Sequence, residues 1–133
     1  MPLMTPLQIV GLWAALNAIV TLALAINCGV ARGKTKVLLG DGGNETMTRA
    51  MRAHANNVEY TPLVLVMLVT LGLLQASTLI LHLVGGLLFV GRAAHGFGLT
   101  TNSGISAGRG LGMLLTMVAA LIAIVMLLIK AFG

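Results

Sequence analysis

A short group of charged and amide side chains stands at the entrance of a long apolar segment. Arg49, Arg52, Asn56 and Glu59 are spaced three, four and three residues apart. Residues at this spacing return to the same face of a helix, so they form one polar stripe. Such a stripe, leading into lipid, costs free energy unless it faces other helices, water or a ligand. We therefore predict a binding site here.

Three more polar residues are expected at a similar depth, namely Arg92, His95 and Arg109. With Arg52, Asn56 and Glu59 they predict a cavity that is basic apart from one carboxylate. This combination suits a ligand with several carboxylates and one ammonium group. Nearby arginines can also lower the pKa of a bound thiol, because positive charge favours the thiolate.

The elements that carry these residues follow from composition. The chain of 133 residues is 58% hydrophobic and 8% charged, whereas a soluble domain carries about a quarter charged residues. Runs of Leu, Ala, Val, Ile and Met favour helices over a transmembrane barrel, whose strands would alternate in polarity. We expect an all-α integral membrane protein, with a single domain over residues 1–133.

Four apolar segments are long enough to cross the ~30 Å hydrocarbon core as helices. Asn44 is a plausible N-cap for the second of them, and Pro62 could kink it. Gly104, Gly108 and Gly112 recur every four residues, which permits close contact between helices. We expect a four-transmembrane-helix bundle with helices at about 6–30, 45–75, 78–99 and 107–130.

The positive charges predict an orientation. Every Lys and Arg except Lys130 flanks the first or the third connection between helices, and the second connection has none. Positively charged loops remain in the cytoplasm. The N and C termini are therefore expected on the non-cytoplasmic side, with the polar cavity facing the cytoplasm.

Several simpler interpretations stay open. Arg49, Arg52 and Arg109 could each contact lipid phosphates, and Glu59 could form a structural ion pair with Arg52 or Arg92. A single cysteine excludes an internal disulfide and a cysteine-based metal site, and three scattered histidines do not form a metal site either. Dispersed charges and scarce aromatic residues argue against nucleic-acid binding.

The stretch from Arg52 to Pro62, Arg-Ala-His-Ala-Asn-Asn-Val-Glu-Tyr-Thr-Pro, closely resembles the signature of the MAPEG family, membrane-associated proteins in eicosanoid and glutathione metabolism. The stretch from Gly91 to Gly98, Gly-Arg-Ala-Ala-His-Gly-Phe-Gly, resembles its small bacterial branch. The resemblance implies a homotrimer of four-helix subunits in the bacterial inner membrane. Glutathione would bind between neighbouring subunits near the cytoplasmic face.

The resemblance also implies roles for individual residues. Arg52, Asn56, Glu59 and Tyr60 match the glutathione contacts of the motif, with the glutamate on the amino group and arginines on the carboxylates. Arg109 is the nearest match to the arginine that stabilises the thiolate. The other implied glutathione-binding residues are Arg92, His95 and Arg32, the last as a further basic contact at the end of the first helix.

The leading hypothesis is a membrane-bound glutathione transferase, with peroxidase activity as an added possibility, that conjugates glutathione to lipophilic electrophiles. One alternative is a small proton-coupled multidrug exporter, although a glutamate among arginines is a poor site for a cation. Another is a non-catalytic membrane protein that binds an anionic lipid headgroup. Glutathione binding, proton release on substrate addition, and phospholipid retention without turnover distinguish the three.

Overall fold

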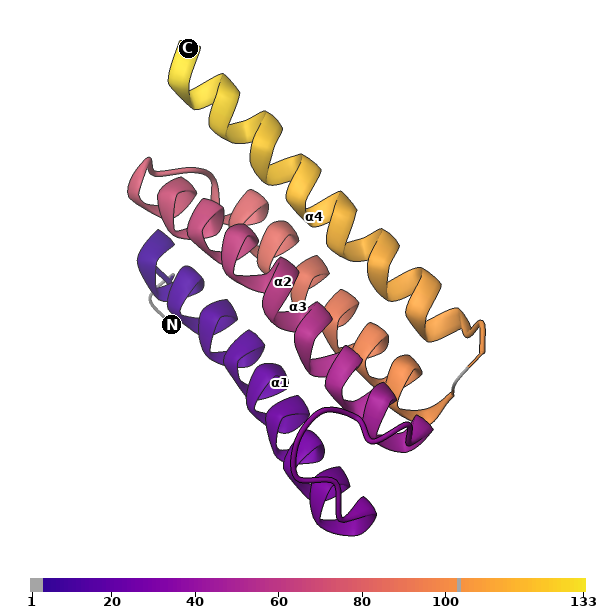
Figure 1. Ribbon diagram of the computed structural model, residues 1–133. Helices are drawn as coiled ribbons and strands as arrows, with labels where there is room; N and C mark the ends of the chain where they lie inside the picture. The colour runs from indigo at the N-terminus through magenta and orange to yellow at the C-terminus, as the bar shows by residue number, and fades with distance from the viewer. Residues whose placement is uncertain (1–3, 103) are drawn as a thin grey trace.

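The computed structural model describes residues 4–102 and 104–133, so residues 1–3 and 103 of the expected domain lie outside the described part. It is a bundle of four helices (Figure 1): α1 Pro6–Thr35, α2 Glu45–Leu73, α3 Thr78–Thr101 and α4 Ala107–Phe132. All four are long and apolar enough to cross a membrane. The expected all-α four-transmembrane-helix bundle is confirmed. The start of α1 and the end of α4 lie at the same end of the bundle, beside the α2–α3 turn.

Side-chain caps fix where the helices begin. Thr5 and Gln8 form a capping box at the start of α1, in which each side chain binds the other residue's backbone amide. Asn44 caps α2 as predicted, accepting from the Met47 amide at 3.1 Å. Ser77 and Ser106 cap α3 and α4 in the same way. Each cap satisfies a backbone donor that the helix itself leaves free.

The helix ends differ slightly from the predicted ones. α1 continues to Thr35, beyond the predicted end near residue 30. Its last turn contains the basic residues Arg32 and Lys34, so the apolar segment ends before the helix does. Thr35 is followed by Lys36 in a left-handed conformation, with φ of 57°. Pro62 lies inside α2, which continues on both sides of it.

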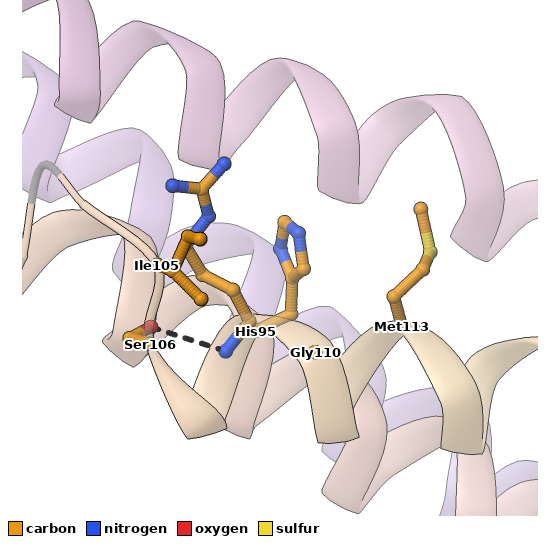
Figure 2. A pocket seen from close by; sticks show the side chains of 6 residues that line it. His95, Ile105, Ser106, Gly110 and Met113 are labelled. Carbon is orange, nitrogen blue, oxygen red and sulfur yellow. Dashed lines mark hydrogen bonds between the residues drawn. The ribbon is translucent and has the colours of Figure 1, made fainter.

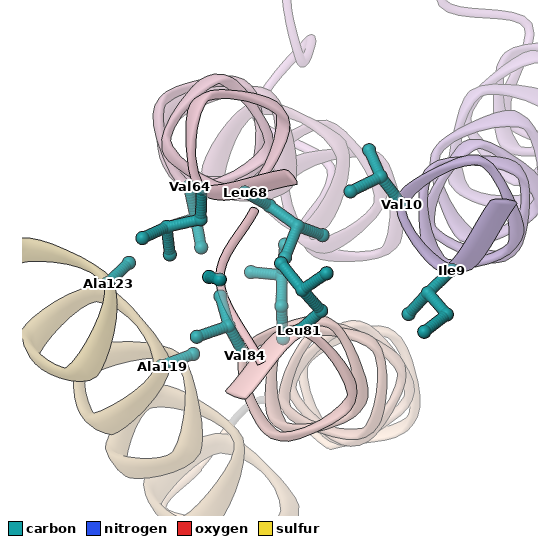
Figure 3. Close-up of a cluster of buried hydrophobic side chains, with 11 residues drawn as sticks. Ile9, Val10, Val64, Leu68, Leu81, Val84, Ala119 and Ala123 are labelled. Carbon is teal, nitrogen blue, oxygen red and sulfur yellow. The ribbon is translucent and has the colours of Figure 1, made fainter. Parts of the chain in front are cut away.

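A core of aliphatic side chains holds the bundle together at the end that carries the termini (Figure 3). Leu68 of α2 and Leu81, Val84 and Leu88 of α3 are fully buried. α1 and α4 complete the core, with small residues on the α4 side, and the labelled contributors are Ile9, Val10, Ala119 and Ala123. Because lipid tails are as apolar as these side chains, van der Waals contact between closely packed atoms stabilises the packing of α2 on α3.

The other half of the bundle depends on close contact between α3 and α4. A Cβ atom on Gly112 would lie 2.5 Å from both the Gly91 carbonyl oxygen and the His95 amide nitrogen. Gly108 likewise packs against the Ala94 carbonyl. The predicted close contact therefore involves Gly108 and Gly112, whereas Gly104 precedes α4 and is exposed. This contact sets the distance between the polar residues of α3 and those of α4.

Candidate functional site

The most deeply buried charged residue is Arg92, which is 1% exposed and ties three helices together. Its Nε donates to Thr116 Oγ1 of α4 at 2.9 Å. Its Nη1 donates to Asn56 of α2, at 2.8 Å to the side-chain oxygen and 3.3 Å to the carbonyl oxygen. The guanidinium carbon lies 5.7 Å from the centre of the Tyr60 ring. The sequence motif of α2 is thus bound to α3 through Arg92.

These contacts explain how a guanidinium is tolerated inside an apolar bundle. Burying a charge is costly unless hydrogen bonds and a favourable field replace its water. Thr116 and Asn56 provide the acceptors, and the face of Tyr60 provides a cation–π contact. Among the described residues Nη2 has no hydrogen-bond partner, so Arg92 retains one buried donor group available for a ligand or a water molecule.

Arg52 and Glu59 form an ion pair on the outer face of α2. Arg52 Nη1 lies 3.7 Å from Glu59 Oε1, and the two side chains are 57% and 51% exposed. The same face continues into Leu63 and Val66, which are also exposed. Of the two ion pairs considered for Glu59, the structure therefore forms the one with Arg52. A charged pair on this surface, one turn from apolar residues, indicates a face that another molecule covers.

A cavity of about 320 Å³ lies where α3 meets the start of α4. It is lined by His95, Ile105, Ser106, Arg109, Gly110 and Met113. Figure 2 shows the His95 ring and the Met113 side chain projecting from these two helices in the same direction. His95 is only 7% exposed. The cavity therefore joins polar and apolar walls.

Arg109 occupies the first turn of α4, in a half-buried position beside this cavity. The backbone amide of Arg109 donates to the Ser106 hydroxyl at 3.3 Å (Figure 2), and Arg109 Nη1 donates to the Gly104 carbonyl at 2.9 Å. The guanidinium therefore lies at the N-terminal end of α4, where the helix dipole is positive. The charge of Arg109 and the helix dipole both favour an anion in the cavity, either a carboxylate or a thiolate.

Arg32 lies elsewhere in the subunit. Its Nη1 donates to the carbonyl oxygens of Val37 and Gly40, at 3.3 and 3.0 Å, and so holds the loop after α1. Within the described part of one chain, α1 makes no contact with α4. A single subunit therefore brings Asn56 and Tyr60 of α2 against Arg92 of α3, and places His95 and Arg109 together beside the cavity. Arg52 and Glu59 lie on the exposed outer face of α2, and Arg32 lies apart from the other predicted residues.

Arg49, the first residue of the polar stripe, contributes to the start of α2 instead. Its Nη1 lies 3.2 Å from Glu45 Oε1, one turn earlier in the helix. Nearby, Asp41 accepts from the Gly43 amide and the Thr48 hydroxyl, both at 3.0 Å. These hydrogen bonds, that from Gly43 first, lower the pKa of the Asp41 carboxyl below its ordinary value. The loop is thus fixed by its own polar groups.

Two residues of the site were not identified from the sequence. Thr116 is fully buried, accepts from Arg92 and donates to the Gly112 carbonyl at 2.8 Å. Ser106 caps α4 and lines the cavity. A signal existed for Thr116, since it is a hydroxyl residue in an apolar segment and such groups usually bond to a neighbouring helix. Among the described residues, no cluster of three or more His, Cys, Asp or Glu could hold a metal ion.

Comparison with known proteins identifies the family of this chain. The model of the MAPEG family matches residues 10–129. Inner membrane protein YecN of Escherichia coli K12 is 32% identical over 87 residues, which cover 65% of this chain and 66% of YecN, slightly less than two thirds. YecN of E. coli O6:H1 strain CFT073 matches to the same extent. The search of solved structures finds no significant match. The chain belongs to the MAPEG family.

Proposed function

We propose that the protein is a membrane-bound glutathione transferase that joins the glutathione thiolate to lipophilic electrophiles and also acts as a peroxidase. The observation that carries this proposal is the hydrogen bond from Arg92 to Asn56. It joins the α2 motif, which bears the exposed Arg52–Glu59 pair, to α3, whose His95 lines a cavity with Arg109. Membership of the MAPEG family supports the same reaction class.

The charges match the ligand group by group. Glutathione has two carboxylates, one ammonium group and one thiol. Glu59 is the acidic group of the cluster and would receive the ammonium, while Arg52 would bind a carboxylate. Asn56 and Tyr60 would add hydrogen bonds. The tripeptide would thus replace the solvent that now covers the Arg52–Glu59 pair.

Arg109 would supply the catalytic step by stabilising the thiolate. Lowering a thiol pKa from ~8.5 to ~6.5 requires ~2.7 kcal/mol, which one desolvated arginine can provide. The sulfur then attacks the electrophile directly, and the bond to the leaving group breaks, so no protein nucleophile is needed. The electrophile would enter from the bilayer towards the apolar walls formed by Ile105 and Met113.

A homotrimer in the inner membrane would complete the site. The ion pair on α2 is exposed in a single chain, and Arg32 lies too far round the bundle to reach α4 of its own subunit. A neighbouring subunit that covers α2 could bring its own Arg32 to the ligand. The clustering of positive residues at one end of the helices favours a cytoplasmic position for the site, and YecN is itself named as an inner membrane protein.

Steady-state conjugation of glutathione to 1-chloro-2,4-dinitrobenzene tests the proposal. The parent protein should catalyse the reaction, and Arg109→Ala should lower kcat/KM by about tenfold or more, since ~1.4 kcal/mol corresponds to a factor of ten. Lys130→Ala removes the same charge at the opposite end of α4 and should leave the rate unchanged. Because Arg109 also holds the Gly104 carbonyl, thermal unfolding is measured for each variant. An inactive parent would exclude the transferase, and an unimpaired Arg109→Ala would exclude Arg109 from the step.

A further inference from the structure

A second groove lies on a different side of the bundle, between α1 and α3. Its volume is about 410 Å³, and its lining includes Ala23, Asn27, Phe89, Ala93, Phe97 and Thr100. Most of its surface is apolar, and it is formed by helix faces that take no part in the site described above. The Leu24 side chain packs on Gly96 at its floor, where a Cβ atom would lie 3.0 Å from Leu24 Cδ2.

One end of this groove continues into a smaller cavity of about 90 Å³, whose lining is more polar than that of the groove. Asn27 and Thr100 line both spaces, and Lys34 and Thr46 line only the smaller one. The first turn of α2 therefore meets the ends of α1 and α3 at this point. The result is a continuous channel on the surface, apolar along the helices and polar at the end that carries most of the positive charge.

Two polar side chains at this end, Asn27 and Lys34, have no partners in the described part of the chain, whereas the Thr100 hydroxyl donates to the Gly96 carbonyl at 2.9 Å. Asn27 is an exposed amide within the apolar segment of α1, and no hydrogen bond to its side chain occurs among the described residues. Lys34 follows seven residues later, on the same helix face, and forms no ion pair with any described residue. The nearby Glu45 carboxylate is bound to Arg49. An amide without a partner at this depth, followed by a free cation, indicates a ligand with an acceptor and a negative charge.

We infer that this groove binds an anionic phospholipid. One acyl chain lies between α1 and α3 along Ala93 and Phe97. The Asn27 amide donates to an ester carbonyl, and the Lys34 ammonium binds the phosphate. The two residues are ~10 Å apart along α1 at ~1.5 Å per residue. This is slightly more than the ~5–8 Å depth of the headgroup region on each side of the bilayer, and the flexible lysine side chain spans the difference.

A lipid fits this surface better than a second copy of the chain. An apolar helix packed over the groove would leave Asn27 and Lys34 buried without partners, which is costly. A phospholipid provides an acceptor for Asn27 and a negative charge for Lys34, and its acyl chain covers the apolar walls. This inference is independent of glutathione binding, because no residue of the groove lines the cavity beside His95 and Arg109.

Native mass spectrometry of the purified full-length protein, titrated with dioleoylphosphatidylglycerol and with dioleoylphosphatidylcholine, tests the inference. Phosphatidylglycerol should bind more tightly. Lys34→Gln should raise its Kd about fivefold, the value expected for one cation at a lipid surface. Lys36→Gln removes the same charge two residues away and should change the Kd less than twofold. Asn27→Leu should weaken both lipids, because it removes the ester contact.

A pair of groove-filling variants separates the lipid from other occupants. Ala93→Phe fills the α1–α3 groove and should abolish the tight binding, whereas Ala25→Phe fills the separate α1–α2 groove and should not. Equal weakening by Lys34→Gln and Lys36→Gln would overturn the inference, since it indicates diffuse charge attraction. A change of subunit number in Ala93→Phe, with lipid binding unaltered, would identify the groove as a contact between copies and would also overturn it. If Ala93→Phe does not fold, the Lys34 and Asn27 variants decide.

Discussion

Arg92 of α3 donates a 2.8 Å hydrogen bond to the side-chain oxygen of Asn56 in α2. This bond fixes the orientation of the amide that stands at the centre of the α2 motif, between Arg52 and Glu59. It also means that the position of the motif depends on α4, because the same guanidinium is bound to Thr116. The polar residues of three helices therefore form one connected unit.

This dependence predicts the effect of Thr116→Val. Valine keeps the shape of threonine but leaves the Arg92 Nε–H without its acceptor in a buried position, which should destabilise the protein by about 1–3 kcal/mol. Thr70→Val is the matched control, because the Thr70 hydroxyl bonds only to the Val66 carbonyl of its own helix. Denaturant unfolding in detergent measures both. Equal stability of the two variants would contradict the role of Thr116.

The close contact of α3 and α4 predicts a contrast between two glycines. In Gly112→Ala the new methyl group meets backbone atoms of Gly91 and His95 at 2.5 Å, so the helices must separate. The expected cost is about 1–3 kcal/mol, and the altered distance between His95 and Arg109 should lower activity. Gly110→Ala on the same helix meets no atom within 4 Å and should unfold like the parent. Thermal unfolding compares them, and a stable, active Gly112→Ala would count against the packing argument.

The loop before α2 should respond to acid. The hydrogen bonds from Gly43 and Thr48 favour the Asp41 carboxylate and lower its folded-state pKa below 3.8. Their contribution is therefore complete above that value and is lost as the pH falls through the lower, folded pKa. Amide hydrogen exchange at Gly43 should show constant protection from neutral pH to about pH 4, and a decrease below it.

Asp41→Asn provides the control for this pH dependence. Because asparagine does not titrate, the variant should protect the Gly43 amide less than the parent at neutral pH and should lose little more in acid. A parent protein whose protection begins to fall near neutral pH would show that another group controls the loop.

The helices themselves could be predicted from the sequence because their signals are local. Apolar length defined the spans, and Asn44 was recognisable as a cap from its place before a helix. The ends were less predictable, since α1 continues through basic residues at the membrane boundary, where hydropathy falls but helical hydrogen bonding persists.

The details of the candidate site were not predictable. Spacing along each helix predicts that Arg52, Arg92 and Arg109 lie at one level, yet it does not tell how each helix is rotated about its axis. Because of that rotation, Arg92 is buried against Thr116, while Arg52 is exposed beside Glu59. Arg32 shows the same limit, because its partners Val37 and Gly40 depend on the path of a loop turned by glycines with positive φ.

The most direct test of the proposed function is a calorimetric titration of the purified protein with glutathione. The parent should bind with measurable heat, and Arg52→Ala and Glu59→Gln should each weaken binding by about tenfold or more, as loss of a partner for a charged group predicts. Glu45→Gln, which removes a carboxylate paired with Arg49 about two helix turns before Arg52, should bind like the parent. The absence of heat from the parent, or equal affinities for Glu59→Gln and Glu45→Gln, would contradict a glutathione site on this face of α2.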